Sequence, residues 1–183
     1  MLIKGSITAL VTPMKEDASI DYESLKNLIN FQIDNGIDGI VAVGTTGESA
    51  TIDFEDHIKL IEFFVKESDN RVPIIAGTGA NSTEEAIILT KAAKTIGADA
   101  ALLVSPYYNK PPQEGLLQHH LKIADEVQIP QILYNVPSRT ASFIESSTVS
   151  KLAKHENIIG IKDATGEMKN LEDLKSLCNK EID

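Results

Sequence analysis

Strand-like and helix-like segments alternate along the whole chain without a linker between them. Short apolar runs typical of buried strands recur six times, and a helical pattern follows each one. The runs are GSITALVTP (5–13), GIDGIVAVGTT (36–46), VPIIAGTG (72–79), ADAALLVSP (98–106), PQILYNVP (130–137) and NIIGIKDATG (157–166). Strict alternation of this kind predicts a parallel sheet covered by helices, built from βα units of roughly 30 residues each.

The intervening segments carry helix start and stop signals. The first helix is expected between the N-cap Asp21 and Gly36, with Leu25, Leu28, Ile29 and Ile33 on its apolar face. A capping-box pair, Ser82 and Glu85, opens the third, which stops near Gly97. The remaining helices are expected over residues 53–66, 113–127, 147–155 and 170–179.

Two architectures fit this alternation. A doubly wound sheet could close with six strands, whereas a (β/α)8 barrel needs two further units and typically about 250 residues. Polar residues at the carboxyl ends of the strands favour the barrel, because its active site draws on many strands instead of one switch point. They are Thr8, Thr12, Thr45, Thr46, Thr78, Ser105, Tyr134, Asn135 and Lys162. We therefore predict an α/β fold over residues 1–183, a TIM (β/α)8 barrel truncated to about its first six βα units.

Charge and composition exclude several classes of protein. The 183 residues include 27 acids and 17 bases, for a net charge of -10, whereas nucleic-acid binding needs a basic face. There is no apolar stretch of about 18 residues for a membrane span, and the N-terminal segment lacks a signal-peptide pattern. A single cysteine, Cys178, fits a reducing compartment. We expect a cytoplasmic protein that binds neither nucleic acid nor membrane.

The histidines offer no metal site. His57, His119, His120 and His155 lack metal-ligand spacing with a carboxylate partner. We expect all of them at helix surfaces and predict no metal.

Lys162 ends the apolar run of Ile158, Ile159 and Ile161, which is typical of a strand covered on both faces. Lysine is rarely buried, so this one either reaches from the strand end to solvent or is a desolvated amine. Desolvation lowers the pKa of an amine and creates a neutral nucleophile that can form a Schiff base with a carbonyl. Tyr134 ends the preceding strand, where it is either a core aromatic or a proton relay for that amine.

Three further segments could bind substrate. VGTTGES (43–49) is a strand followed by a Thr45–Thr46 turn, whose N–H groups and hydroxyls suit a small carboxylate unless it is only a connecting turn. Tyr107 and Tyr108 are adjacent in a loop, so one can serve its own site and the other a neighbouring surface, or both can plug an interface. Arg139 suits bidentate binding of a substrate carboxylate, or else forms a loop salt bridge.

At these residues the chain resembles the dihydrodipicolinate synthases, the pyruvate-dependent class I aldolase-like enzymes of lysine biosynthesis. The matching blocks keep their order and spacing over the whole chain: GSITALVTPM, GIVAVGTTGESAT, PIIAGTGANST, SPYYNKPPQEGL, QILYNVPSRT and NIIGIKDATG. The resemblance implies a cytoplasmic, oligomeric lyase that condenses pyruvate with L-aspartate 4-semialdehyde to give 4-hydroxy-tetrahydrodipicolinate in diaminopimelate and lysine biosynthesis. It implies no metal or organic cofactor, because pyruvate is held covalently.

The resemblance also implies roles for individual residues. Lys162 matches the lysine that forms the Schiff base. Tyr134 and Thr45 match members of a proton relay that Tyr108 completes from the neighbouring subunit of a tight dimer, within a homodimer or homotetramer. The Thr45–Thr46 pair matches the pyruvate carboxylate site, and Arg139 matches the arginine that holds the carboxylate of the semialdehyde.

A lysine feedback site is implied as well. Its matching positions are Ser49, Ala50, His57, Asn81, Glu85 and Tyr107. Phe54 departs from the histidine found in some lysine-sensitive members of the family. N-acetylneuraminate lyase and the keto-deoxy sugar acid aldolases share the glycine-rich turn, the tyrosine and the lysine, and are the alternative enzymes. The arginine of YNVPSRT and the paired tyrosines favour the synthase.

The length of the chain departs from the family pattern. Members complete eight βα units and add a C-terminal helical region, whereas this sequence stops after the sixth helix. Three explanations are open: a fragment of a longer enzyme, a truncated product that pairs its open strand edges with another copy, or an inactive remnant that serves only as an assembly module. In each case we expect condensation to be weaker than in a chain with all its units.

Overall fold

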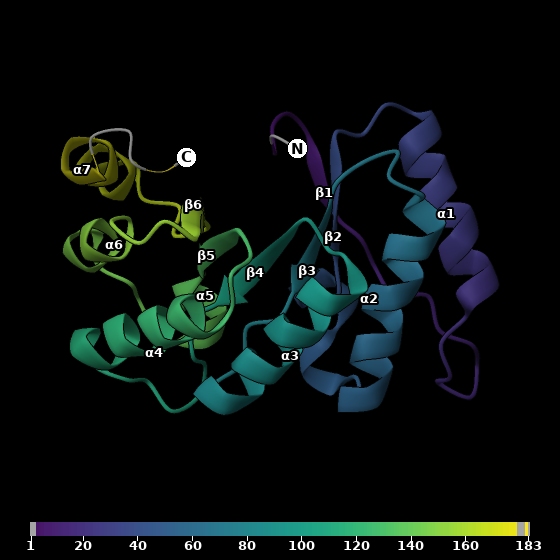
Figure 1. Ribbon diagram of the computed structural model, residues 1–183, viewed down its shortest axis with the longest axis horizontal. Helices are drawn as coiled ribbons and strands as arrows, with labels where there is room; N and C mark the ends of the chain where they lie inside the picture. The colour runs from purple at the N-terminus through teal and green to yellow at the C-terminus, as the bar shows by residue number, and fades with distance from the viewer. Residues whose placement is uncertain (1–2, 179–181, 183) are drawn as a thin grey trace. The chain divides into compact units, whose positions relative to one another are not determined.

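The computed structural model describes residues 3–178 and 182. Strands and helices alternate along it, as Figure 1 shows. The described chain divides into two compact units, and each is treated by itself below. The first unit comprises the residues up to Gly77 together with Ala92–Asp99, and the second comprises Thr78–Lys91 together with the residues from Ala100 onward.

The first unit is built on three parallel strands with β2 in the middle. The strands are β1 (Ile7–Ala9), β2 (Gly39–Ala42) and β3 (Ile74–Gly77). Its helices are α1 (Tyr22–Asp34), α2 (Phe54–Ser68) and the 3₁₀ turns η1 (Thr45–Gly47) and η2 (Ser49–Thr51). The Asp21 side chain caps α1 by accepting from the Ser24 N–H at 3.0 Å, as its position in the sequence predicts.

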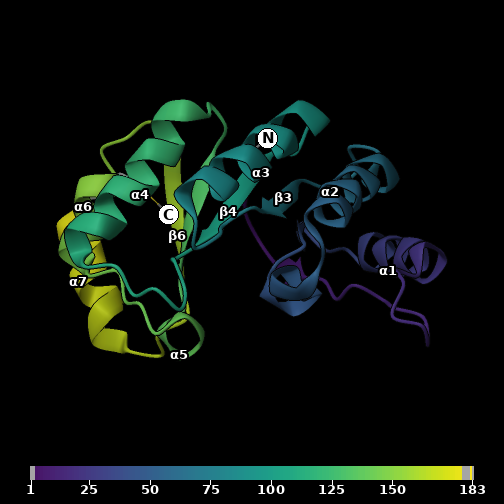
Figure 2. The same cartoon turned by 90° about the horizontal axis from the view of Figure 1, so that it is seen from below.

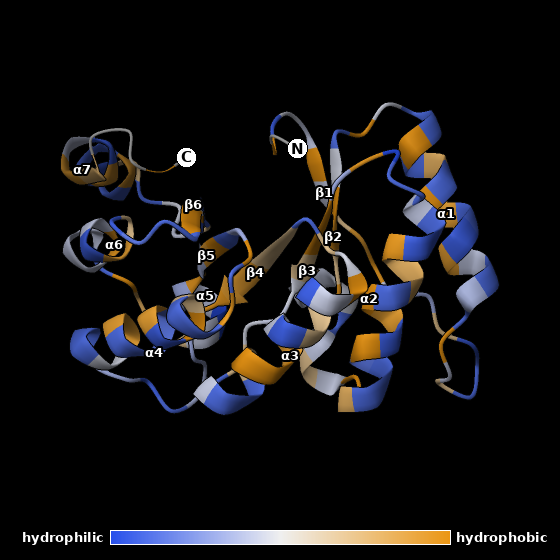
Figure 3. Cartoon of the chain, viewed as in Figure 1, coloured by the Kyte–Doolittle hydropathy of each residue, from blue (hydrophilic) through white to orange (hydrophobic). Residues whose placement is uncertain are grey.

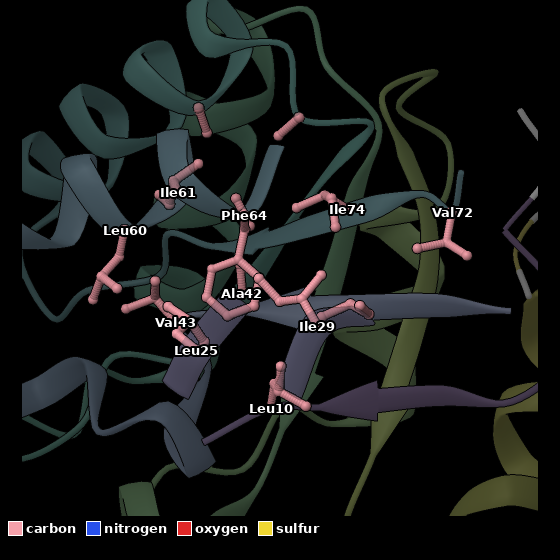
Figure 4. Close-up of a cluster of buried hydrophobic side chains, with 14 residues drawn as sticks. Leu10, Leu25, Ile29, Ala42, Val43, Leu60, Ile61, Phe64, Val72 and Ile74 are labelled. Carbon is pink, nitrogen blue, oxygen red and sulfur yellow. The ribbon is translucent and has the colours of Figure 1, made fainter. Parts of the chain in front are cut away.

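Alternate residues of the strands carry the core of this unit. Ile40 and Ala42 of β2 and Ile74 of β3 are fully or almost fully buried and pack with α1 and α2. Figure 4 shows the ring of Phe64 beside Ala42 and Ile29 in the middle of this cluster. Burial of these side chains stabilises the packing of the two helices on the strands.

The second unit also holds three parallel strands, with β5 in the middle. The strands are β4 (Ala100–Val104), β5 (Gln131–Asn135) and β6 (Ile158–Asp163). Its helices are α4 (Gln113–Glu126), α5 (Pro137–Thr140), α6 (Ser146–Leu152) and α7 (Met168–Cys178). The helix α3 (Thr83–Ile96) is divided between the units, with its residues up to Lys91 in the second and those from Ala92 in the first.

One side of the second sheet carries its helices. Leu133 of β5 packs in one cluster with Leu116 of α4, Val149 of α6 and Leu174 of α7. In Figure 2, α4, α6 and α7 lie on the same side of β6. Figure 3 shows β4 hydrophobic over its length, whereas α4 alternates between hydrophobic and hydrophilic residues as expected for a helix with one buried face.

Most predicted elements are present, with shorter strands. The expected run of residues 5–13 contains only Ile7–Ala9 as strand, and that of residues 36–46 only Gly39–Ala42. The turns η1 and η2 and the short helix α5 were not predicted, since three or four residues are too few to show helical periodicity. The last helix covers Met168–Cys178, and the expected end at Asn179 lies outside the described residues.

The prediction for the histidines was wrong. His57, His119 and His120 are buried at 5%, 5% and 0% exposure, and only His155 is partly exposed. The buried three lie on the inner faces of α2 and α4, where an imidazole fills the space of an apolar side chain. Within the part of the chain that the structure describes, no helix is both long and apolar enough to cross a membrane.

Candidate active site

Lys162 and Tyr134 face each other on neighbouring strands of the second unit. They are register partners in the parallel pairing of β5 with β6, so their side chains leave the sheet on the same face. The ammonium nitrogen of Lys162 lies 4.3 Å from the centroid of the Tyr134 ring. The two residues that the sequence singled out for chemistry therefore meet in the structure.

A one-residue irregularity in β6 places Lys162 on this face. Gln131 pairs with Ile158, but the next residue of β5, Ile132, pairs with Gly160, so Ile159 is an extra residue in β6. Strict alternation from Ile158 would turn Lys162 towards the helices, because residues four apart share a face. The extra residue shifts the phase, so that Ile158 and Ile161 both contribute to the helix-side core. Lys162 then leaves the sheet on the opposite side.

The surroundings of Lys162 are mixed. Desolvation by the neighbouring protein lowers the pKa of its amine below the usual value. The side chain is nevertheless exposed, and Ile159 and Ile161 are only half-buried, so the expected strand covered on both faces is wrong for the described chain. The reason is that β6 pairs only with β5 among the described residues and lies at the edge of the sheet of this unit.

Tyr134 is held more firmly than Lys162. It is 7% exposed, and its backbone carbonyl accepts hydrogen bonds from both the N–H and the hydroxyl of Ser105, at 3.1 and 3.2 Å. Leu133, beside it in β5, points into the helix-side core, so Tyr134 points to the other face. A buried phenol beside an exposed amine suits a group that passes protons to it.

The Thr45–Thr46 turn follows β2 in the first unit. Both threonine side chains are exposed in η1, and the buried Gly47 that closes the turn accepts a hydrogen bond from the Thr12 hydroxyl at 2.7 Å. The first N–H groups of a helical turn have no acceptor within it, which leaves them available to an anion. The turn thus presents hydroxyls and N–H groups from an anchored backbone.

Two residues before this turn, the backbone has an unusual conformation. Val43 has φ of 52°, a left-handed value that is a genuine outlier for a β-branched residue. Its carbonyl passes so close to Gly77 that a Cβ there would lie 2.3 Å from the carbonyl oxygen. The buried His57 ring hydrogen-bonds the Gly77 carbonyl at 2.7 Å. Close packing at the end of β3 therefore holds the strained residue that leads into the turn.

The loop with the paired tyrosines lies in the second unit. Tyr108 is 91% exposed with φ of 74°, whereas Tyr107 is half-buried, so the two side chains lie in different environments. Burial raises the pKa of Tyr107, and the nearby Glu85 carboxylate adds to the shift. The Asn81 amide donates to the Tyr107 carbonyl at 3.2 Å. Asn81, Glu85 and Tyr107 therefore form one polar cluster.

The remaining predicted residues fall in both units. Arg139 is exposed in the last turn of α5, and no ion pair to it is found among the described residues, so the loop salt bridge is not observed. Ser49 and Ala50 lie in η2, and His57 is buried in α2. Thr45, Thr46, Ser49, Ala50 and His57 belong to the first unit.

Comparison with known proteins identifies the family. Residues 2–183 match the profile of the dihydrodipicolinate synthetase family. The chain belongs to this family. It is 56% identical over 181 residues to the 4-hydroxy-tetrahydrodipicolinate synthase of Alcanivorax borkumensis, a match that covers 99% of this chain and 62% of the relative.

Solved structures of the family agree with the fold. The dihydrodipicolinate synthase of Acinetobacter baumannii, described as complexed with pyruvate, has a TM-score of 0.97 and 53% identity, covering 99% of this chain and 62% of that one. The synthase of Aquifex aeolicus has a TM-score of 0.95 and 51% identity, covering 97% of this chain and 61% of that one. The predicted architecture, a (β/α)8 barrel represented by about six of its units, is thereby confirmed. The chain spans about 62% of the length of the curated relatives that it matches.

One group of polar residues in this family member was missed by sequence reasoning. Asp163, Asn170 and Ser146 form a hydrogen-bonded chain beside the end of β6, and Asn170 and Ser146 are buried. The D-x-T pattern of Asp163 and Thr165 could have revealed the first link, since Asp commonly binds the backbone two residues on. The other links join Asn170 of α7 to Asp163 of β6 and to Ser146 of α6, and the sequence gives no signal for them.

Proposed function

We propose that this chain carries the chemistry of condensing pyruvate with L-aspartate 4-semialdehyde through a Schiff base on Lys162. The observation that carries the proposal is the Lys162 amine, with its lowered pKa, 4.3 Å from the ring of Tyr134 at paired positions of β5 and β6. The name of the Alcanivorax relative and the pyruvate in the Acinetobacter structure support it. Since the chain spans 62% of that relative, the activity of the whole enzyme is part of the proposal.

The first step joins pyruvate to the protein. The neutral amine of Lys162 attacks the ketone carbon of pyruvate and forms a C–N bond, while the carbonyl oxygen takes up a proton. The resulting carbinolamine loses water, giving the Schiff base. Tyr134 is the group that passes protons to and from the oxygen of the carbinolamine, because its ring lies beside the amine.

The second step makes the carbon–carbon bond. Loss of a proton from the pyruvate methyl group converts the Schiff base to an enamine, with the protonated lysine nitrogen accepting the electron pair. The enamine carbon then attacks the aldehyde carbon of the semialdehyde, whose oxygen takes up a proton to become a hydroxyl. The lysine nitrogen provides the electron sink, so the reaction as proposed requires no metal or organic cofactor.

Two groups are assigned to the substrate carboxylates. The Thr45–Thr46 turn offers hydroxyls and backbone N–H groups to the pyruvate carboxylate. Arg139, exposed at the end of α5, offers a bidentate site to the carboxylate of the semialdehyde. Tyr108 completes the relay in a neighbouring copy of the chain, which is consistent with its 91% exposure.

Lysine is proposed as a regulatory ligand. The cluster of Asn81, Glu85 and Tyr107 offers a carboxylate, an amide and a phenol suited to the ammonium and carboxylate groups of an amino acid. Ser49, Ala50 and His57 complete the set of matching positions. Calorimetric titration with lysine tests this assignment, and Glu85→Gln should weaken binding because it removes the charge that faces an ammonium.

Borohydride trapping tests the proposed chemistry. With pyruvate and borohydride, the intact mass should increase by one pyruvic acid less one oxygen atom, and peptide mapping should place the adduct on Lys162. Lys162→Arg should abolish the adduct, because guanidinium stays protonated. An adduct that persists in Lys162→Arg would remove Lys162 from the mechanism.

Substrate choice needs a separate assay. Turnover of aspartate semialdehyde, compared with cleavage of N-acetylneuraminate and of a keto-deoxy sugar acid, distinguishes the synthase from the related aldolases. A chain extended with the remaining residues of the Alcanivorax relative provides the reference rate. Condensation should gain more than trapping from the extension, because trapping needs fewer groups and catalysis is sensitive to misplacement of about 1 Å.

A further inference from the structure

Asp163 follows Lys162 and lies on the opposite face of β6. Its register partner is Asn135, whose side chain bonds Ile144 on the helix side of the sheet, donating to the carbonyl at 3.0 Å and accepting from the N–H at 3.1 Å. Successive residues of a strand point to opposite faces, so the Asp163 carboxylate and the Lys162 amine leave the backbone in opposite directions.

Three donors satisfy the Asp163 carboxylate. One oxygen accepts from the N–H and the hydroxyl of Thr165, at 3.0 and 2.6 Å, and the other accepts from the Asn170 amide at 2.6 Å. Charge-assisted hydrogen bonds of this kind are about twice as strong as neutral ones. The carboxylate thus hydrogen-bonds both the loop after β6, at Thr165, and α7, at Asn170.

The chain of bonds continues into α6. The Asn170 side-chain oxygen accepts from the Ser146 hydroxyl at 2.9 Å, and both residues are buried, at 6% and 9% exposure. The backbone closes the same region, since the Ala164 N–H donates to the Asn135 carbonyl at 2.9 Å. The end of β6 is therefore tied to β5, α6 and α7 within one residue of Lys162.

This anchoring follows directly on the irregularity at Ile159. Because of the extra residue, strict alternation from Ile158 no longer decides which face each later residue of β6 occupies. Asp163 is the first residue after Lys162 whose side chain can hold the strand from the helix side. We infer that Asp163 is a positioning residue, which through Asn170 and Ser146 holds the backbone of β6 so that the Lys162 amine lies over the Tyr134 ring. Its importance for catalysis rests on the function proposed above.

A spectroscopic test does not depend on that function. The Lys162 amine lies over the Tyr134 ring, 4.3 Å from the ring centroid, so the methylene group bonded to the amine lies in the ring current. The ring current displaces the proton resonance of this methylene group upfield. Tyr134→Leu identifies the resonance by removing the displacement. Asp163→Ala should also remove most of it. Asp163→Asn should retain the displacement. In that variant the Asn170 amide can rotate, so that its oxygen accepts from the new amide at position 163 and its nitrogen donates to the Ser146 hydroxyl.

The matched control removes another bond between the same two helices. The Ser150 hydroxyl of α6 donates to the Leu177 carbonyl of α7 at 3.2 Å, away from Asp163, so Ser150→Ala should leave the displacement unchanged. If Asp163→Ala does not fold, Asn170→Ala breaks the link while keeping the Thr165 bonds, and a smaller loss of the displacement is expected. The inference would be overturned if folded Asp163→Ala kept the full upfield displacement of the Lys162 methylene resonance. Where Asn170→Ala replaces a variant that does not fold, the same outcome in folded Asn170→Ala would overturn it. A loss of displacement in Ser150→Ala equal to that in the test variant would overturn it as well.

Trapping with pyruvate and borohydride then measures the consequence. The maximal rate of adduct formation should fall roughly 10- to 100-fold in Asp163→Ala, with a much smaller change in the pyruvate concentration that gives half the maximal rate. Asp163→Asn should recover most of the rate. An unchanged rate in Asp163→Ala overturns the positioning role. Absence of adduct in the parent chain, with the ring-current results as expected, contradicts the proposed function alone.

Discussion

Two opposing influences act on the amine of Lys162. The face of the Tyr134 ring attracts the ammonium form, whereas desolvation favours the neutral amine and lowers the pKa from 10.5. We expect the trapping rate to rise with pH as the amine loses its proton and to reach half of its maximum below pH 10.5. Pyruvate trapping from pH 6 upward, roughly to pH 11, measures this profile. A midpoint at or above the pKa of an ordinary lysine would contradict the assignment.

The buried histidine pair makes the second unit sensitive to acid. His119 and His120 pack edge to face, the Thr83 hydroxyl bonds His119 at 2.8 Å, and neither ring nitrogen of His120 has a partner among the described residues. Burial lowers the pKa of His119 from 6.5 to about 4 and that of His120 to about 3. Both rings are therefore neutral in the folded protein at neutral pH.

This pair predicts a loss of stability on mild acidification. Below pH 6.5 the unfolded chain takes up protons on these imidazoles and the folded chain does not, so stability falls as pH falls. At pH 5 the loss should be on the order of 2 kcal/mol per buried imidazole. Denaturant unfolding at pH 7 and pH 5 measures it. His120→Phe, which fills the site with an apolar ring, should lose less stability over this range, and an equal loss in both proteins would refute the argument.

At the scale of an element, the ends of β2 and β3 approach each other too closely to accept a side chain at Gly77. A Cβ at Gly77 would lie 2.3 Å from the Val43 carbonyl oxygen, which is backbone and cannot rotate away. Gly77→Ala should therefore destabilise the protein by about 1–3 kcal/mol or more and displace the strand end that leads to Thr45. Gly39→Ala is the control in β2, since its nearest neighbours are 3.4 Å away. Equal midpoints of urea unfolding for the two variants would show that the close approach is not restrictive.

The elements of the chain differ in how far the sequence predicts them. Caps and stops located the long helices, because Asp21 and Gly97 act within one turn of each helix end. The phase of β6 could not be predicted, since alternation from Ile158 puts Lys162 on the helix side. The extra residue at Ile159 depends on pairing with β5, which is a contact between segments far apart in the sequence. The link from Asn170 to Ser146, 24 residues apart, was missed for the same reason.

At the scale of the whole molecule, the exposed loop predicts self-association. Tyr108 is 91% exposed in a left-handed conformation that is uncommon for a residue other than glycine. Such a conformation on a solvated aromatic suggests that another surface receives it. We expect a dimer or larger oligomer in light scattering at micromolar concentration, and Tyr108→Ala should weaken it. A monodisperse monomer would argue against this proposal and against the role of Tyr108 in a neighbouring copy.

The architecture was predictable from two features together: alternation of strand and helix left two arrangements, and the polar residues at the strand ends favoured the barrel. The candidate site was predictable in kind, since Lys162 and Tyr134 end consecutive strands and meet as expected. The surroundings of these residues were not. The sequence does not reveal that the Lys162 side chain is exposed and that the Tyr134 side chain is buried, because solvent access depends on which segments cover each face of the sheet.

The irregularity in β6 also limits how this segment can change during evolution. Replacing one side chain leaves the phase of the strand intact, so the half-buried Ile159 can vary at little cost. Inserting or deleting one residue between Ile158 and Lys162 exchanges the two faces, putting the amine among the helices and an apolar side chain beside Tyr134. Selection for the amine therefore preserves the number of residues here more strictly than their identity. Alignments of active relatives should contain substitutions in this strand but no gaps.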